Sequence, residues 1–368
     1  MAFFRAAKRL LSDMPKLSTM QIAAPTALVS CGAVSFAHVK CEATIAPSLA
    51  TASVATIDSG NVGGFVAARG VQPPAQFCQL SDGRVIAYHV EILGKGDEKD
   101  AVPVLGLHGM AMGNRLGLHP SETDAFDKLK RPVAMICIDR PGYGATSPPP
   151  ANYSYGHFVK DMAEFLQKIP RAQHKPICVL GQSSGGPNAM ALCAMADELP
   201  FGIAAAAIVS SDPPYYHLDA PDSLTKCTRA LDLTPAAPTI DGNTHCPYGM
   251  PLIDFVEQNL VPFFSAKGVA GKGVTWSGVY GFMNDFTLER MPWPFKVENI
   301  TLGDKLTIWV GEKDVPCIAE GAPFIHALIK RSNLMILPDE DHFYITKPHF
   351  YAAILEKLVD EWDAQFRE

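Results

Sequence analysis

The residues best suited to chemistry lie in a short stretch around Ser183. Gly181, Ser183 and Gly185 form a G-x-S-x-G pattern, preceded by the apolar run Ile177–Leu180 and followed by the apolar segment Met190–Met195, where a helix is expected to begin. This pattern predicts a strand, a tight turn and a helix, with the serine hydroxyl exposed at the turn. The flanking glycines let the chain reverse without side-chain clashes. On its own the motif also fits a glycine-rich turn without chemistry, so its meaning depends on partner residues.

A serine hydroxyl attacks efficiently only when a base removes its proton and a third group orients that base. Asp314 follows an apolar strand-like run, and His342 lies in a loop before the last expected helix. The chain order Ser183, Asp314, His342 is one that such triads take. Singly, each of the two downstream residues fits a solvated loop, but together they favour a nucleophile, an orienting acid and a base. Asp212 also follows an expected strand and stays open as an alternative acid.

The tetrahedral intermediate of acyl transfer needs backbone N–H groups directed at its oxyanion. The residue after the nucleophile, Ser184, is expected to supply one. The loop that follows His108-Gly109 is expected to supply the other, through the N–H of Met110. His108 itself is expected to shape this loop rather than to act as a base.

These residues must be positioned by regular elements, and the hydrophobic pattern indicates which ones. Apolar runs bounded by turn residues predict strands at Phe77–Leu80, Arg84–Ile92, Val102–Leu107, Val133–Ile138, Ile177–Leu180, Ile203–Val209, Leu306–Val310 and Leu334–Leu337. A stripe from Phe158 to Ile169 predicts a helix that Pro170 ends, and Tyr351–Trp362 predicts a closing helix. Alternating strands and helices indicate an α/β protein with a mainly parallel sheet covered on both faces.

The rhythm of strands and helices breaks between residues 214 and 300, where prolines, glycines and aromatic residues are mixed. An insertion after the carboxyl end of a strand lies over the edge where α/β sheets bind ligands. The expected organisation is therefore a core built from residues 71–213 and 301–368, with a cap at 214–300. Most of the aromatic side chains in this stretch are expected to form the core of the cap.

The first 70 residues differ from the rest of the chain. They are basic and poor in acidic residues, and apolar side chains recur at helical spacing before Pro15. This composition predicts a transit peptide for a mitochondrion or a plastid, without which the protein is expected in the cytoplasm. A disordered or membrane-surface arm is the alternative, so contact with a membrane through this segment stays open.

The charge and the cysteine content of the chain limit which partners and cofactors are expected. The net charge of −7 argues against nucleic acid, because phosphate binding needs a basic face. The nine cysteines are odd in number, scattered and without a CxxC pair, so neither a zinc site nor a disulfide framework is indicated. A reducing compartment fits this pattern best. No metal or organic cofactor is needed for the chemistry of the three residues.

Several stretches together resemble the α/β-hydrolase superfamily in its capped branch with a serine nucleophile. They are LHGMAMGNR (Leu107–Arg115), DRPGYGAT (Asp139–Thr146), GQSSGGPNAMAL (Gly181–Leu192), GEKDVP (Gly311–Pro316) and DHF (Asp341–Phe343). Asn114-Arg115, Pro187 and the stretch Trp293-Pro294-Phe295 are similar to a largely uncharacterised group within that superfamily. The resemblance covers the chain from about Phe77 onward, and it departs from the family pattern at Asp341, where glycine usually precedes the histidine.

The resemblance implies an α/β-hydrolase fold with an inserted cap. Serine at the turn speaks against the epoxide hydrolase and haloalkane dehalogenase branches, which carry aspartate there. The resulting hypothesis is a serine hydrolase (esterase- or lipase-like) that cleaves small-molecule carboxylic esters or related acyl compounds through an acyl-enzyme. The alternative is a ligand-binding protein or receptor of the same fold with little turnover.

Overall fold

The computed structural model describes residues 76–110, 120–150, 152–172, 175–224, 276–289 and 291–366. All of them belong to one compact unit, Thr56–Glu368. The expected transit peptide at 1–70 and residues 225–275 of the expected cap lie outside the described residues. Among the helices of the described ranges, none combines the length and apolarity needed to cross a membrane.

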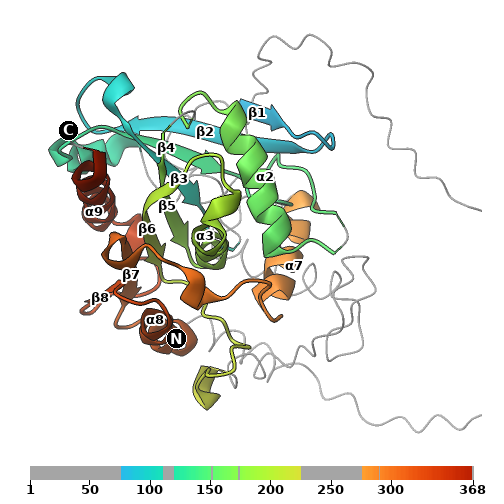
Figure 1. The fold of residues 1–368 in the computed structure, drawn as a ribbon. Coiled ribbons are helices and arrows are strands. Elements are labelled where there is room, and N and C mark those ends of the chain that lie inside the picture. The colour runs from blue at the N-terminus through green and yellow to red at the C-terminus, as the bar shows by residue number, and fades with distance from the viewer. Residues whose placement is uncertain are drawn as a thin grey trace, which may run out of the picture. The chain divides into compact units, whose positions relative to one another are not determined.

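An eight-stranded sheet runs through the described part of the chain in the order β1-β2-β4-β3-β5-β6-β7-β8 (Figure 1). Its β1 and β2 pair antiparallel, as do β2 and β4, and the remaining neighbours are parallel. The strands are β1 (Gln76–Gln79), β2 (Val85–Leu93), β3 (Val102–Leu107), β4 (Val133–Ile138), β5 (Ile177–Gln182), β6 (Ile203–Val209), β7 (Leu306–Gly311) and β8 (Asn333–Leu337). The sequence prediction of a mainly parallel sheet is confirmed.

The strands β3 to β7 are buried along their whole length, which matches their continuous apolar runs. The helices that accompany them are α2 (Tyr155–Lys168), α3 (Gly185–Ala194), α7 (Trp276–Glu289), α8 (Pro316–Leu328) and α9 (Pro348–Phe366). Short 3₁₀ helices are η1 (Glu98–Asp100), η2 (Pro120–Lys128), η3 (Ala196–Glu198), η5 (Val297–Asn299), η6 (Gly303–Lys305) and η7 (Tyr344–Thr346).

Helices cover both faces of the sheet, and strand β5 shows how. Successive side chains of a strand point to opposite faces. The thiol of Cys178 lies 3.7 Å from the carbonyl oxygen of Leu358 on α9, whereas Gly181 lies against Ala189 of α3. Since Cys178 and Gly181 are three positions apart, α9 and α3 pack on opposite faces.

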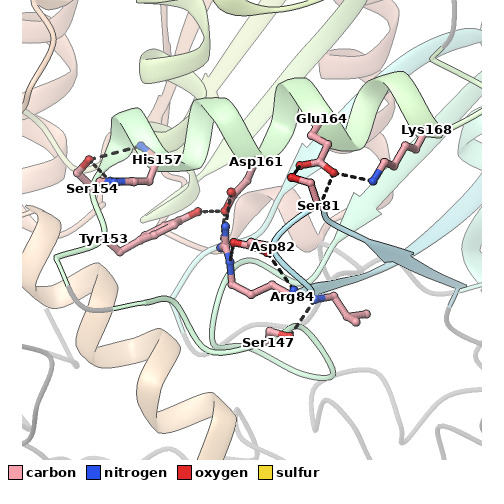
Figure 2. Close-up of polar contacts among 11 residues, drawn as sticks. Ser81, Asp82, Arg84, Ser147, Tyr153, Ser154, His157, Asp161, Glu164 and Lys168 are labelled. Atoms are coloured by element: carbon pink, nitrogen blue, oxygen red, sulfur yellow. Dashed lines mark hydrogen bonds and ion pairs between the residues drawn. The ribbon is translucent and has the colours of Figure 1, made fainter. Parts of the chain in front are cut away.

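The predicted hairpin at the start of the sheet is present, and α2 holds its turn (Figure 2). Ser81 donates to the Glu164 carboxylate through its backbone N–H and its hydroxyl, at 2.5 and 2.9 Å. The Arg84 guanidinium donates to both oxygens of Asp161, at 2.7 and 2.5 Å. These contacts fix the antiparallel edge of the sheet to a helix that Ser154 caps.

Helix α3 begins five residues earlier than the apolar segment at Met190 predicts. It starts at Gly185, two residues after the expected nucleophile Ser183, with Ser184 as its N-cap residue. The stretch Gly185-Gly186-Pro187 reads as a turn, but a proline in the first helical turn needs no N–H partner and does not interrupt the helix. The helix N-terminus therefore lies immediately beside Ser183.

The tight packing of α3 on β5 gives a test of the fold. A Cβ atom on Gly181 would lie 2.5 Å from the Gly185 carbonyl oxygen and 2.6 Å from the Ala189 Cβ. We expect Gly181→Ala to lower the free energy of unfolding by about 1–3 kcal/mol, as overpacking does. The control is Gly202→Ala, whose Cβ would meet nothing within 4 Å. Urea denaturation measures both, and equal midpoints for the two variants would contradict the packing described.

Candidate active site

The turn after β5 presents Ser183 in a strained conformation. Its φ of 52° lies in the left-handed region, which residues other than glycine seldom adopt. The Ser183 N–H donates to the Val209 carbonyl of β6 at 2.9 Å, and the Ser183 carbonyl accepts from the N–H of Gly186 at 2.8 Å. A Cβ atom on Gly185 would overlap the carbonyl oxygen of Leu107. The strand-turn-helix motif therefore needs its glycine because α3 starts in backbone contact with β3.

Three residues that are far apart in the sequence form one chain of hydrogen bonds. The His342 Nε2 lies 3.0 Å from the Ser183 hydroxyl, and the His342 Nδ1 lies 2.8 Å from Oδ1 of Asp314. Because the carboxylate only accepts, Nδ1 carries the proton and Nε2 accepts from the hydroxyl. In this tautomer the imidazole is oriented to remove the proton of Ser183.

The loops after β7 and β8 bring Asp314 and His342 together. The N–H of Glu312 donates to the Leu337 carbonyl at 2.9 Å, and the N–H of Lys313 donates to the Glu340 carbonyl at 2.7 Å. A Cβ atom on Gly311 would overlap the Glu340 backbone, so the two loops are in contact. The Asp314 Oδ1 also accepts from the N–H of Val315 at 2.7 Å. Asp314 and His342 are thus held on one hydrogen-bonded pair of loops.

Asp314 and Asp212, the two candidates for the residue that orients His342, have different hydrogen-bond partners. Asp314 is buried and bonds the imidazole, whereas Oδ1 of Asp212 accepts from the Tyr215 hydroxyl at 2.7 Å. Asp341, which replaces the usual glycine before the histidine, accepts from the N–H of Phe343 at 2.9 Å. The geometry therefore favours Asp314 over Asp212 as the group that orients His342.

Nearby charges change the pKa of His342. Burial lowers this pKa, but the hydrogen bond and the charge of Asp314, together with the charges of Asp212 and Asp341, outweigh burial. The pKa of His342 consequently lies above the ordinary histidine value. The His342 side chain is 19% exposed and the Asp314 side chain is fully buried.

The loop after β3 lies against Ser183. A Cβ atom on Gly109 would lie 2.9 Å from the Ser183 Cβ, so the backbone at Gly109, which Met110 follows, is beside the serine. Ser184 follows Ser183 in the chain and is the N-cap residue of α3. Within the described ranges, neither the Met110 N–H nor the Ser184 N–H donates to another residue. Both expected oxyanion donors thus belong to segments next to Ser183.

His108 has a structural environment, in line with the expectation that it shapes the loop. The N–H of Arg140 donates to its Nε2 at 3.0 Å, so Nδ1 carries the proton and donates to the Gly109 carbonyl at 2.8 Å. Burial and the charge of Arg140 lower the pKa of His108 well below the ordinary value. This buried imidazole is therefore neutral and holds the loop.

The sequence analysis did not identify Asp285 of α7. This residue forms a buried ion pair with Arg140, which in turn bonds to His108. Arg140 lies in the stretch Asp139–Thr146, and a buried arginine requires a negatively charged partner. No pattern in the sequence indicates which acidic residue is that partner. Among the described residues, no group of three or more histidine, cysteine or acidic side chains is arranged to hold a metal ion.

Comparison with known proteins extends these findings. Residues 104–354, more than half of the chain, match the model of the "Alpha/beta hydrolase family". A comparison with curated proteins gave no significant match. Membership of this family supports hydrolase activity in general, on small-molecule substrates.

Solved structures share the fold at low identity. An esterase from Exiguobacterium antarcticum is 19% identical with a TM-score of 0.52, and the match covers 77% of this chain and 98% of that chain. A hydrolase from Pseudomonas aeruginosa PA01 is 17% identical with a TM-score of 0.51, over the same shares. An esterase from Thermogutta terrifontis, with malate bound, is 15% identical with a TM-score of 0.50. The match covers 80% of this chain and 99% of that chain. The fold, the strand order and the family match agree: the chain belongs to the α/β-hydrolase family.

Proposed function

We propose that the protein is a serine hydrolase that cleaves carboxylic esters, or related acyl compounds, through an acyl-enzyme intermediate. The observation that carries this proposal is the hydrogen-bond chain from the Ser183 hydroxyl through His342 to Asp314. A general base within hydrogen-bonding reach of a nucleophile, itself oriented by a buried carboxylate, is the arrangement that serine acyl transfer needs. Family membership and the similarity in fold to two esterases support the same class.

The proposed reaction has two halves. In the first, His342 takes the proton of Ser183 as its oxygen attacks the ester carbonyl, and the imidazolium then protonates the leaving alcohol. In the second, His342 removes a proton from water as the water oxygen attacks the acyl-enzyme, and the imidazolium then returns that proton to the Ser183 oxygen as the acid leaves. Asp314 keeps the imidazole in the required tautomer and stabilises its charged form. The N–H groups of Met110 and Ser184 would stabilise the oxyanion formed in both halves.

The nucleophile is tested by covalent labelling. We expect a fluorophosphonate probe to label the wild type and to leave Ser183→Ala unlabelled, with ester turnover lost in parallel. Ser332→Ala is the matched control, because the Ser332 hydroxyl also lies beside a histidine, 2.8 Å from Nδ1 of His326, but on no strand-to-helix turn. Labelling and turnover should persist in that variant. A wild type that is labelled but turns over no ester would instead indicate a ligand-binding protein or receptor.

The acid is tested by comparing two carboxylates. We expect Asp314→Asn to reduce kcat by about 10³–10⁴-fold, because an amide favours the wrong tautomer of the imidazole. Asp212→Asn removes a charge that is bonded to Tyr215 and not to His342, so kcat should change by less than about tenfold by comparison. Steady-state ester hydrolysis measures both variants. The reverse ranking would make Asp212 the acid.

The pH profile tests the electrostatics of His342. Only the neutral imidazole can act as a base, so kcat/KM should rise with pH as His342 loses its proton. Because the pKa of His342 is raised, the midpoint should lie above the ordinary value of 6.5. Asp212→Asn removes one of the negative charges that raise this pKa, so the midpoint should move to lower pH. An unchanged or higher midpoint in that variant would contradict the assignment.

A further inference from the structure

A buried ion pair joins helix α7 to the carboxyl end of β4. The side chains of Arg140 and Asp285 are each 2% exposed, and the guanidinium donates to both carboxylate oxygens at 2.5 and 2.6 Å. The Tyr143 hydroxyl donates to the same carboxylate at 2.5 Å. A bidentate contact of this kind fixes the orientation of the guanidinium as well as its distance from the carboxylate. The position of Arg140 therefore depends on Asp285.

The other end of Arg140 holds the loop beside the nucleophile. Its Nε donates to the His108 carbonyl at 2.8 Å, and its backbone N–H donates to the His108 imidazole at 3.0 Å. The ring of Tyr143 packs edge-on against that imidazole, with ring centres 4.8 Å apart. The residue before Gly109-Met110 is consequently held through both its backbone and its side chain.

Close packing leaves little freedom between these groups. The N–H of Gly281 on α7 donates to the Gly142 carbonyl at 3.1 Å, and a Cβ atom on Gly281 would overlap the Tyr143 ring. At the opposite end, a Cβ atom on Gly109 would lie 2.9 Å from the Ser183 Cβ. A displacement of α7 must therefore be transmitted to Arg140 and to the loop, because packed groups do not absorb it.

We propose that Asp285 is a positioning residue for the hydrolytic site. Through Arg140 it holds the Gly109-Met110 loop so that the Met110 N–H faces the oxyanion that forms at Ser183. This inference rests on the proposed function and deepens it, because it makes the oxyanion geometry depend on how helix α7 is seated. The buried Asp285 side chain bonds to Arg140 and Tyr143 and not to Ser183, His342 or Asp314, so it acts through Arg140.

The physical reason lies in the charge of Arg140. Without the Asp285 carboxylate, the guanidinium is left buried with no bidentate partner, and a buried charge without its partner is strongly destabilising. The guanidinium then moves toward other acceptors or toward water, and its hydrogen bond to the His108 carbonyl changes with it. Displacing a transition-state donor by about 1 Å can cost about a hundredfold in rate.

The chain contains a matched control of the same chemistry at another place. Arg84 donates to both oxygens of Asp161, whose Oδ2 also accepts from the Tyr153 hydroxyl at 2.6 Å (Figure 2). This cluster also contains an arginine, an aspartate and a tyrosine, but it attaches the β1–β2 hairpin to α2 and not to the loop after β3. Asp161→Asn therefore reproduces the loss of a carboxylate charge without touching the oxyanion loop.

The experiment compares a p-nitrophenyl ester with its thionoester, in which sulfur replaces the carbonyl oxygen. Sulfur accepts hydrogen bonds poorly, so the ratio of the two kcat values reports the oxyanion contact itself. For Asp285→Asn we expect kcat on the ester to fall by about ten- to a hundredfold, with KM much less affected. The thionoester rate should fall far less, so the ratio should shrink. Asp161→Asn should retain the wild-type ratio even where its thermal stability is reduced.

A milder variant covers the case in which Asp285→Asn does not fold. Tyr143→Phe removes only the hydroxyl that donates to Asp285, and it should shrink the ratio in the same direction but less, whereas Tyr153→Phe should not. A folded Asp285→Asn with the wild-type ratio would overturn the inference, as would an equal loss in Asp161→Asn. If the wild type shows no Ser183-dependent turnover, the proposed function fails and the inference with it. Wild-type turnover with an unchanged ratio in the variants removes the inference alone.

Discussion

Backbone hydrogen bonds across the carboxyl edge of the parallel sheet hold the candidate site together. The Ser183 N–H bonds the Val209 carbonyl, the Ser210 N–H bonds the Trp309 carbonyl, and the Glu312 N–H bonds the Leu337 carbonyl, at 2.8–2.9 Å. These contacts link β5 to β6, β6 to β7 and the β7 loop to β8. Ser183, Asp314 and His342 therefore follow the carboxyl ends of β5, β7 and β8, and their spacing follows from strand pairing.

The buried charges of Arg140 and Asp285 are neutralised by direct pairing and by neighbouring hydrogen bonds. Arg140 and Asp285 are both withdrawn from water, yet each finds its partner together with additional hydrogen bonds from Tyr143 and to His108. Burying such a pair adds little to stability compared with apolar side chains of similar volume, so its presence is explained better by orientation than by energy. The partly exposed cluster of Arg84 and Asp161 fixes a hairpin turn in the same way.

The fold and the central residues of the site could be predicted because both depend on local patterns. Continuous apolar runs indicate buried strands. The G-x-S-x-G stretch indicates a tight turn, in which position 185 must be glycine because a Cβ atom there would overlap the Leu107 carbonyl. Asp314 and Asp212 could not be separated from the sequence, because each follows a strand. The contact between the β7 and β8 loops is what distinguishes them, and it arises from tertiary packing at Gly311.

Asp285 and the start of α3 escaped prediction for different reasons. Asp285 lies on a helix within a stretch of irregular composition, and its partner is 145 positions away, so no periodicity reveals the pair. The start of α3 was hidden because glycine and proline, which usually signal a loop, here occupy the first turn of a helix. Local propensity was overridden at that point by packing against β3 and β5.

The hydrogen-bonded edge has a consequence for how the molecule fails under stress. Central strands of a buried sheet are the last elements of a domain to open, and exposed loops open first. Since the hydroxyl, imidazole and carboxylate are spaced by that sheet, local fraying elsewhere leaves their separation intact. The strand β8, which precedes His342, lies at the edge of the sheet and exposes Met335 and Ile336, so we expect the imidazole to lose its alignment before the central strands come apart.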